Sequence, residues 1–229
     1  MTPPASTPTS DGSGLRVDAE RNRLRIVNAA RQAFAELGLD VPLEEIARRA
    51  GVGIGTLYRR YPTRAELIAA AFEPKMTAYA DAARQALAEP DPWRGFCDYM
   101  ERICAMQAGD RGFTTVLTMT FPTAKRFEAD RRRAYADFIA LVERAKAAGK
   151  LRADFVAEDM SMFLMANAGV LTATADAAPE TWHRLVGYLL QACAAQAAQP
   201  LPDPPTSRQM YRAMLRTTHQ QRDGTGPRN

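Results

Sequence analysis

The chain has 229 residues, of which 46% are hydrophobic, and 30 basic against 26 acidic side chains give it a formal net charge of +4 at pH 7. Its length and apolar content suffice for the buried core of one large domain or two smaller ones. No basic segment precedes a short apolar run, and no stretch reaches about 18 unbroken apolar residues, so neither export nor membrane insertion is expected. The expected location is the cytoplasm.

Residues 1–20 are rich in Pro, Ser, Thr and Gly and contain few apolar side chains. Because such a composition cannot bury enough surface to fold, we predict a disordered arm. Arg16, Arg21 and Arg23 lie near the end of this region, and arms of this kind can enter a DNA minor groove. A solvated tail is the alternative interpretation.

The first predicted helix covers residues 21–38 and is amphipathic. One face is apolar and consists of Ile26, Val27, Ala30, Phe34 and Leu37. Gly38 suits the C-terminal cap of this helix. Arginines occupy the other faces, so we expect the apolar face to be buried and the rest to face solvent.

A second, shorter helix is predicted just before a glycine turn. A buried stripe at helical spacing is formed by Leu43, Ile46, Ala47 and Ala50, and Pro42 stands where a first helical residue tolerates proline. The turn is Gly51-Val52-Gly53, in which at least one glycine should adopt a positive φ. This arrangement predicts a helix-turn-helix corner.

The helix after the turn is expected to bury one face and expose the other. Its predicted buried residues are Ile54, Leu57 and Tyr61, and its predicted outer residues are Gly55, Thr56, Tyr58, Arg59 and Arg60. Arginine forms bidentate hydrogen bonds to guanine or phosphate, hydroxyls reach phosphate oxygens, and glycine permits a close backbone approach. The outer face therefore has the chemistry of a helix that binds in a DNA groove.

Two short helices joined by a glycine turn could also pack inside an ordinary core. The charge distribution favours DNA binding instead, because residues 21–64 hold nine arginines against four acidic residues, a balance of +5, whereas the whole chain carries +4. A positive field concentrated in one segment is what a polyanionic partner requires. Pro62 then ends the helix, and Thr63 with Glu66 forms a capping box that starts the next one.

The segment from about residue 21 to 72 resembles the N-terminal DNA-binding domain of TetR-family transcriptional repressors. The run LEEIARRAGVGIGTLYRRYPTRAELI is similar to the family's "IA..AGV" helix, "GTLYR.F" recognition helix and "P(S/T)(K/R)..L" helix start. Arg60, Tyr61 and Arg64 stand where the family often has His, Phe and Lys, and Gly53-Ile54 replaces the usual polar residue after the turn. The operator sequence therefore does not carry over from a relative.

The resemblance also implies roles for single residues of this segment. Base reading is expected mainly from Arg59, Thr56 and Gly55. The residues expected to clamp phosphates or hold the helix are Tyr58, Arg60, Tyr61, Thr63 and Arg64.

From residue 64 onward the pattern is helical and lacks segments of alternating hydrophobicity. The expected helices cover residues 64–88, 92–107, 110–120, 123–148, 156–176 and 180–198, with a short one over 206–218. Asp91 followed by Pro92 is typical of a helix start, because Asp is a favourable N-cap and proline suits the first helical position. A break is expected at Pro74.

The interior of this larger part is expected to be rich in aromatic and methionine side chains. A plain helix-bundle core explains this pattern, and a pocket for variable apolar ligands is the functional alternative. TetR-family proteins commonly house an effector site in this half, and by that resemblance the candidate ligand-binding residues are Trp93, Phe96, Met100, Phe113 and Met119. No family motif supports these five positions individually.

Cysteine and histidine usage argues against a metal site or a catalytic site. Cys97, Cys104 and Cys193 lack metal-type spacing and suit reduced thiols in a core, although Cys97 and Cys104 lie seven residues apart and could form a thiol sensor. His183 and His219 are the only histidines and are far apart in sequence. We therefore expect no metal, no cofactor and no catalytic residues, and hence no enzyme.

The last two long helices are expected to form a dimer interface. Apolar residues recur at helical spacing in 156–176 and 180–198, and a short link between the helices predicts antiparallel packing. Small residues in both helices would let a second copy approach closely. Core packing within one chain explains part of the same pattern.

We therefore expect an all-α chain with a disordered arm (1–20), a three-helix helix-turn-helix DNA-binding domain (21–66), a larger helical domain for ligand binding and dimerisation (67–199) and a C-terminal tail (200–229). The expected function is that of a homodimeric transcriptional regulator, a repressor released from a palindromic operator by a small apolar ligand. The alternative is an all-helical small-molecule-binding protein or enzyme without a DNA role.

Overall fold

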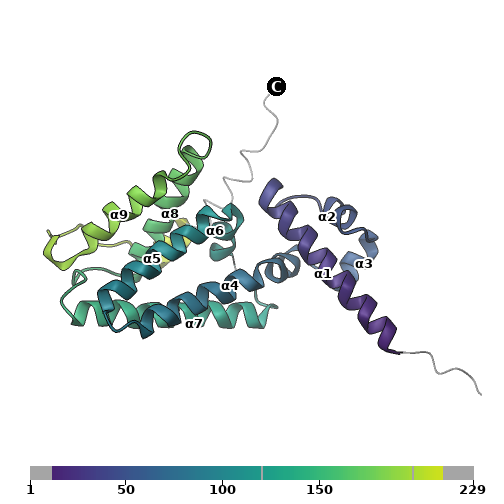
Figure 1. The fold of residues 1–229 in the computed structure, drawn as a ribbon, viewed down its shortest axis with the longest axis horizontal. Helices are drawn as coiled ribbons and strands as arrows, with labels where there is room; N and C mark the ends of the chain where they lie inside the picture. Colours follow the sequence, from purple (N-terminus) through teal and green to yellow (C-terminus); the bar gives the residue numbers. More distant parts are fainter. Residues whose placement is uncertain (1–11, 120, 198, 214–229) are drawn as a thin grey trace, which may run out of the picture. The chain divides into compact units, whose positions relative to one another are not determined.

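A computed structural model describes residues 12–119, 121–197 and 199–213 of the chain (Figure 1). Over these residues the regular secondary structure is helical, and extended pairing is limited to one isolated bridge between Leu151 and Ala194. The predicted all-α class is thus confirmed. None of the helices in the described part combines the length and the apolar composition needed to cross a bilayer.

The helices are α1 (Gly12–Leu37), α2 (Leu43–Ala50), α3 (Ile54–Arg60), α4 (Arg64–Ala88), α5 (Pro92–Ala108), α6 (Arg111–Thr118), α7 (Lys125–Ala147), α8 (Ala157–Ala173) and α9 (Thr181–Cys193), followed by a short 3-10 helix, η1 (Ala195–Ala197). The chain divides into two compact units, with the boundary between Leu67 and Ile68 inside α4. We call them the N-terminal unit and the C-terminal unit.

The core of the N-terminal unit forms where α1 and α2 pack against each other and α3 packs on α2. The predicted stripe of α2 is confirmed, since its buried residues are Leu43, Ile46, Ala47 and Ala50. The predicted face of α1 is confirmed for Ile26, Val27, Ala30 and Phe34, all buried. It is wrong for Leu37, which is 54% exposed because α1 ends at this residue and no further turn covers it.

The predicted disordered arm is wrong for residues 12–20, which form the first turns of α1. The side chains of residues 17–20 are exposed, and Asp18 and Glu20 each form a short-range ion pair. Arg21 lies 3.7 Å from Asp18, and Arg23 lies 2.7 Å from Glu20, each pair at the i,i+3 spacing that supports an exposed helix. Residues 1–11 and the side chain of Arg16 lie outside the described part.

The C-terminal unit contains the predicted long helices, with two differences that have physical reasons. Pro74 does not break α4, because Phe72 and Met76 on either side are buried and packing holds the helix together. α9 ends at Cys193 rather than near 198, because the backbone then becomes extended and Ala195 N–H donates to the Lys150 carbonyl at 2.9 Å.

The start of α5 follows the prediction. Its N-cap Asp91 accepts hydrogen bonds from the backbone N–H groups of Trp93 and Arg94, at 2.9 and 3.3 Å. Near the C-terminal end, residues 207–213 are helical, within the short helix predicted over 206–218. The positions from 214 onward lie outside the described residues.

Candidate nucleic-acid interface

The helix-turn-helix corner is built as the sequence predicts. Gly51 adopts a left-handed conformation with φ of 63°, and its N–H donates to the Arg48 carbonyl at 3.2 Å. Val52 N–H donates to the Ala47 carbonyl at 3.1 Å, which closes the end of α2. Gly53 is extended and starts α3, accepting a hydrogen bond from Thr56 N–H at 2.9 Å.

The buried face of α3 is narrower than predicted. Leu57 is 0% exposed and Tyr61 is 7% exposed, as expected for residues that hold this helix on the unit. Ile54, expected in the same stripe, is 37% exposed. It is the first residue of a seven-residue helix, so no preceding helical turn covers its side chain.

The opposite face of α3 is open to solvent. Gly55, Tyr58, Arg59 and Arg60 are exposed, and Thr56 is half-buried. Arg59 Nη2 donates to Thr56 Oγ1 at 3.1 Å, so two predicted base-reading residues lie in contact along the helix. A single guanidinium has five N–H donors, so Arg59 keeps most of its donors for a base edge or a phosphate. The face thus presents donors and one phenol to solvent, and the described residues of the N-terminal unit do not cover it.

Three other predicted DNA-binding residues make contacts that hold the unit together. The Arg64 Nη1 group donates to the carbonyls of Leu39 and Val41, at 2.9 and 2.6 Å. Thr63 Oγ1 accepts a hydrogen bond from Glu66 N–H at 3.2 Å, which is half of the predicted capping box. Tyr61 is buried. The sequence predicts that Tyr61, Thr63 and Arg64 either clamp phosphates or hold the helix. These contacts fit the second role.

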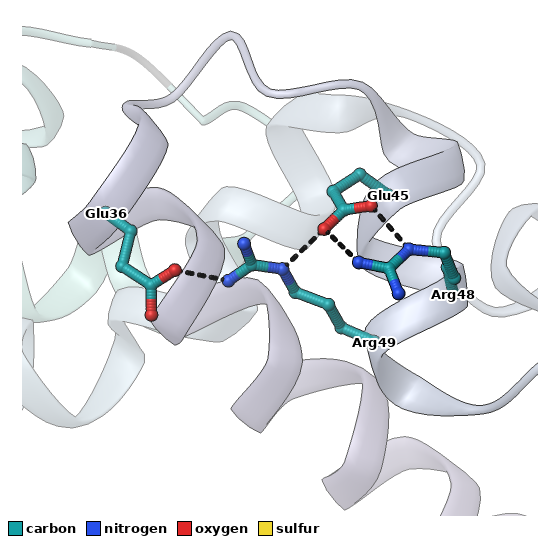
Figure 2. A network of polar contacts seen from close by, with 4 residues as sticks. All are labelled: Glu36, Glu45, Arg48 and Arg49. Atoms are coloured by element: carbon teal, nitrogen blue, oxygen red, sulfur yellow. Dashed lines mark hydrogen bonds and ion pairs between the residues drawn. The ribbon is translucent and has the colours of Figure 1, made fainter.

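An ion-pair network that the sequence reasoning missed joins α2 to α1 (Figure 2). Glu45 accepts hydrogen bonds from both Arg48 and Arg49, each at 2.7 Å, and Arg49 Nη1 lies 2.6 Å from Glu36 Oε2 on α1. The hydrogen bonds from Arg48 and then Arg49 lower the pKa of Glu45 to about 2. The i,i+3 and i,i+4 spacings of Glu45 indicated its helix-internal pairs, whereas the contact with Glu36 depends on tertiary packing.

The five predicted ligand-binding residues lie in different surroundings. Phe96, Met100 and Phe113 are buried in the interior, and Met119 is half-buried. Trp93 stacks on Phe96 with ring centroids 5.7 Å apart and lines a surface hollow. The other residues that line this hollow are Cys97, Leu190, Gln191, Ala194 and Gln196.

The C-terminal unit also contains a buried amide pair that the sequence reasoning missed. Gln107 on α5 and Asn167 on α8 are 1% and 0% exposed. Asn167 Nδ2 donates to Gln107 Oε1 at 2.8 Å and to the Cys104 carbonyl at 3.2 Å, and Gln107 Nε2 donates to Thr114 Oγ1 at 2.9 Å. Only the apolar run around Asn167 signalled that this side chain would be buried.

All three cysteines are free thiols; Cys104 and Cys193 are buried and Cys97 is half-buried. Burial raises the pKa of Cys97, Cys104 and Cys193 to about 12 in each case, and nearby acidic groups add to the effect. Since the thiolate is the reactive form, these surroundings favour reduced core thiols over the alternative of a thiol sensor.

Comparison with known proteins gives a consistent result. The profile of bacterial regulatory proteins of the tetR family matches residues 26–71, which contain α2 and α3. An HTH-type transcriptional regulator from Staphylococcus aureus is 39% identical over 54 residues, which are 23% of this chain and only 29% of the relative's length.

Solved structures align over more of the chain. The TetR transcriptional regulator SCO0520 from Streptomyces coelicolor is 32% identical, with 75% of this chain and 98% of that chain covered and a TM-score of 0.49. FadR from Bacillus subtilis, solved in complex with stearoyl-CoA, is 14% identical, with 77% and 99% covered and a TM-score of 0.52. The second likeness concerns the fold alone.

Proposed function

This chain belongs to the TetR family of bacterial regulatory proteins, and we propose that it is a homodimeric repressor that leaves a palindromic operator when a small apolar molecule binds. The family profile covers the helix-turn-helix segment, and SCO0520 is 32% identical over 98% of its own length. Members of the family are DNA-binding regulators rather than enzymes, in agreement with the prediction that the chain is not an enzyme.

The exposed face of α3 is the observation that supports operator binding most directly. We assign base reading to Arg59, Thr56 and Gly55, because a guanidinium can bind guanine in a bidentate manner and a glycine permits a close approach. Tyr58 and Arg60, both exposed, are assigned to phosphates. In a two-fold symmetric dimer, each subunit would place one α3 in successive major grooves, about 34 to 36 Å apart.

Homodimer formation is proposed through α8 and α9, which pack against each other within the chain. The outward side of α8 exposes small and apolar residues, namely Met162, Ala166, Gly169 and Ala173. α8 is apolar on nearly all sides, which is typical of a helix covered on more than one face. A second copy packed on this side would bury the small residues in a four-helix interface.

The dimer can be tested by one substitution on this side of α8. A Cβ added at Gly169 would have open space around it, with nothing within 4 Å beyond the adjoining backbone of its own helix, and arginine is a better helix former than glycine. We therefore expect Gly169→Arg to leave the fold intact and shift the mass in solution, measured by light scattering, from that of a dimer to the 25.2 kDa of one chain. Ala140→Arg on the exposed side of α7 is the matched control. A dimeric Gly169→Arg variant would contradict the proposed interface.

The proposed effector is a small apolar molecule that binds in the C-terminal unit. The half-buried Trp93 beside its hollow and the aromatic interior with Phe96 and Phe113 support an apolar ligand. FadR from Bacillus subtilis was solved with stearoyl-CoA, so this architecture is compatible with a ligand that has an apolar part. Met100 and Met119 remain candidates for the same site.

Release from DNA requires that the ligand bind more tightly to a dimer in which the two recognition helices have a different separation from the one that fits the operator. We propose that ligand binding moves α4, which begins at Arg64 and continues to Ala88, and thereby changes that separation. The coupling then equals the difference in ligand affinity between the two arrangements. A protein that acts on operator DNA works beside the chromosome, so the cytoplasmic location predicted from the sequence is part of the same proposal.

Genomic SELEX with the purified full chain tests the proposed function. We expect enrichment of sequences with two inverted half-sites whose centres lie one helical turn or a small multiple of a turn apart. A parallel selection on beads without protein identifies sequences that the matrix retains. If no motif is enriched over that background, the operator proposal is wrong and the alternative of a helical protein without a DNA role is favoured.

A further inference from the structure

Three arginines on α1 each contact the side chain that lies three residues before them. The contacts join Arg21 to Asp18, Arg23 to Glu20, and Arg25 to Asn22. The first two partners are carboxylates, whereas Arg25 Nη2 donates to the neutral amide oxygen of Asn22 at 2.5 Å. Among the described residues, Arg25 makes this hydrogen bond and no ion pair. The amide therefore holds the Arg25 guanidinium in place and leaves its positive charge uncompensated.

Arg25 lies beside the helix-turn-helix corner. The residue is exposed, and a Cβ added at Gly51 would lie 3.8 Å from Arg25 Nη1. Gly51 is the left-handed residue that ends α2, and α3 begins shortly afterwards at Ile54. The guanidinium from α1 is therefore close to the turn that leads into the N-terminal end of the recognition helix, the end that carries Gly55 and Thr56.

This position is suited to a contact with the DNA backbone. In helix-turn-helix complexes, residues at the start of the recognition helix contact base edges, and the helix before it crosses the phosphate backbone. Phosphate oxygens are therefore expected close to the turn between the two helices. An arginine without an acidic partner can bind such a phosphate directly, whereas an arginine paired with a carboxylate must first give up that pair. Of the three α1 arginines, Arg25 has the neutral partner.

We propose that Arg25 is a phosphate-binding residue on α1, and that Asn22 orients its guanidinium without cancelling its charge. Arg25 directly precedes residues 26–71, the stretch matched by the family profile, and it is not among the DNA-binding residues expected from the sequence. Phosphate contacts carry no direct sequence information, so Arg25 contributes affinity and salt dependence rather than base preference. The proposal rests on the operator binding proposed above.

The first test compares Arg25→Gln with Arg21→Gln in the full chain by fluorescence anisotropy. Both arginines lie on α1, about one helical turn apart, and each substitution removes one positive charge, so a general electrostatic effect is matched. Each protein is titrated at several salt concentrations with a duplex selected by the wild-type chain and with a scrambled duplex of equal length and composition. We expect Arg25→Gln to weaken binding to both duplexes about tenfold and to reduce the salt slope by about 1, and Arg21→Gln to leave the slope unchanged.

The second test changes the partner instead of the arginine. In Asn22→Asp a carboxylate replaces the amide that contacts Arg25, so we expect the salt slope and the affinity to fall as they do in Arg25→Gln. An added negative charge also weakens binding by a general effect, and a double-mutant cycle separates the two causes. If Asp acts through Arg25, the variant with both substitutions should bind little more weakly than Arg25→Gln alone. Thermal unfolding followed by circular dichroism shows whether each variant is folded.

The conservative variant Arg25→Lys keeps the positive charge and should retain most of the wild-type salt slope. Equal changes of slope in Arg25→Gln and Arg21→Gln would overturn the phosphate contact, and additive losses in the cycle would overturn the role of Asn22. If the wild-type chain itself binds the selected duplex no more tightly than the scrambled one, the proposed function fails instead. The failure of the proposed function and the failure of this proposal are therefore distinguishable.

Discussion

The two units of this chain differ in where their chemically distinctive side chains lie. These side chains are exposed in the N-terminal unit and buried in the C-terminal unit. In the N-terminal unit, Tyr58, Arg59 and Arg60 project from a short helix into solvent, while Leu57 and Tyr61 of the same segment are buried. In the C-terminal unit, Gln107 and Asn167 are buried among apolar side chains, and the aromatic rings pack on one another. A DNA-binding function can therefore be inferred from the surface pattern of the first unit. The effector specificity of the C-terminal unit depends instead on how the side chains of its interior are arranged in space.

Among the substitutions that test this comparison between the two units, Leu57→Ala is expected to have the largest effect. Leu57 is fully buried at the centre of α3, so we expect a loss of about 3 kcal/mol from the stability of the N-terminal unit and loss of operator binding. Ile54→Ala is the matched control, because this exposed residue of the same helix should cost only about 0.5 kcal/mol. Hydrogen exchange followed by mass spectrometry can measure protection in each unit. Equal losses from the two variants would contradict the assignment of Leu57 as the anchor.

A smaller loss of stability, in the C-terminal unit, is expected from Asn167→Leu. The substitution leaves Gln107 Oε1 and the Cys104 carbonyl without their buried donor, at a cost of about 2 kcal/mol. Thr172→Val in the same helix is the control, since that exposed hydroxyl only bonds back to the Ala168 carbonyl. Thermal unfolding measures both variants. An Asn167→Leu variant as stable as the wild-type chain would show that the buried amide pair adds nothing to the interior.

The ion-pair network of α2 predicts a pH dependence confined to the N-terminal unit. Hydrogen bonds from Arg48 and Arg49 lower the pKa of Glu45 from 4.5 to about 2, so its stabilising contribution is complete above pH 4.5 and is lost as the pH falls toward 2. The difference in melting temperature between the wild-type chain and Glu45→Gln should therefore shrink over this range. Glu44→Gln removes an exposed carboxylate beside it and should show no such trend. A constant difference for Glu45→Gln down to pH 2 would contradict the network.

Thiol-modifying reagents are expected to have no measurable effect on operator binding by the folded chain. Because burial raises the pKa of Cys97, Cys104 and Cys193 to about 12, the thiolate fraction at pH 7.5 is negligible and N-ethylmaleimide should label the folded chain slowly. Unfolded protein, in which all three should react quickly, is the control for the reagent. Rapid labelling of Cys97 in the folded chain, together with altered operator binding, would restore the thiol-sensor alternative.

Local spacing predicted those features whose causes are local. The left-handed Gly51, the burial of Leu57 and the cap at Asp91 each depend on a few neighbouring residues, and the structure has all three. Helical periodicity predicts buried positions for Ile54 and Leu37, yet both are exposed, because periodicity says which residues share a face and not how far a neighbouring element covers that face.

Contacts between distant parts of the sequence could not be predicted in this way. Arg64 donates to the carbonyls of Leu39 and Val41, and the partners Asn167 and Gln107 are 60 residues apart, so neither contact leaves a periodic pattern. The same limit applies to the ligand residues. Trp93 lines a hollow only because α9 lies beside α5, and that arrangement is a property of the fold.

The central claim, that the outer face of α3 reads DNA, is tested most directly by anisotropy titrations of Arg59→Ala and Arg60→Ala with a selected duplex and its scrambled counterpart. We expect Arg59→Ala to lower the preference for the selected duplex about tenfold, and Arg60→Ala to weaken binding to both duplexes and reduce the salt slope by about 1. An Arg59→Ala variant unchanged in both affinity and preference would contradict the account.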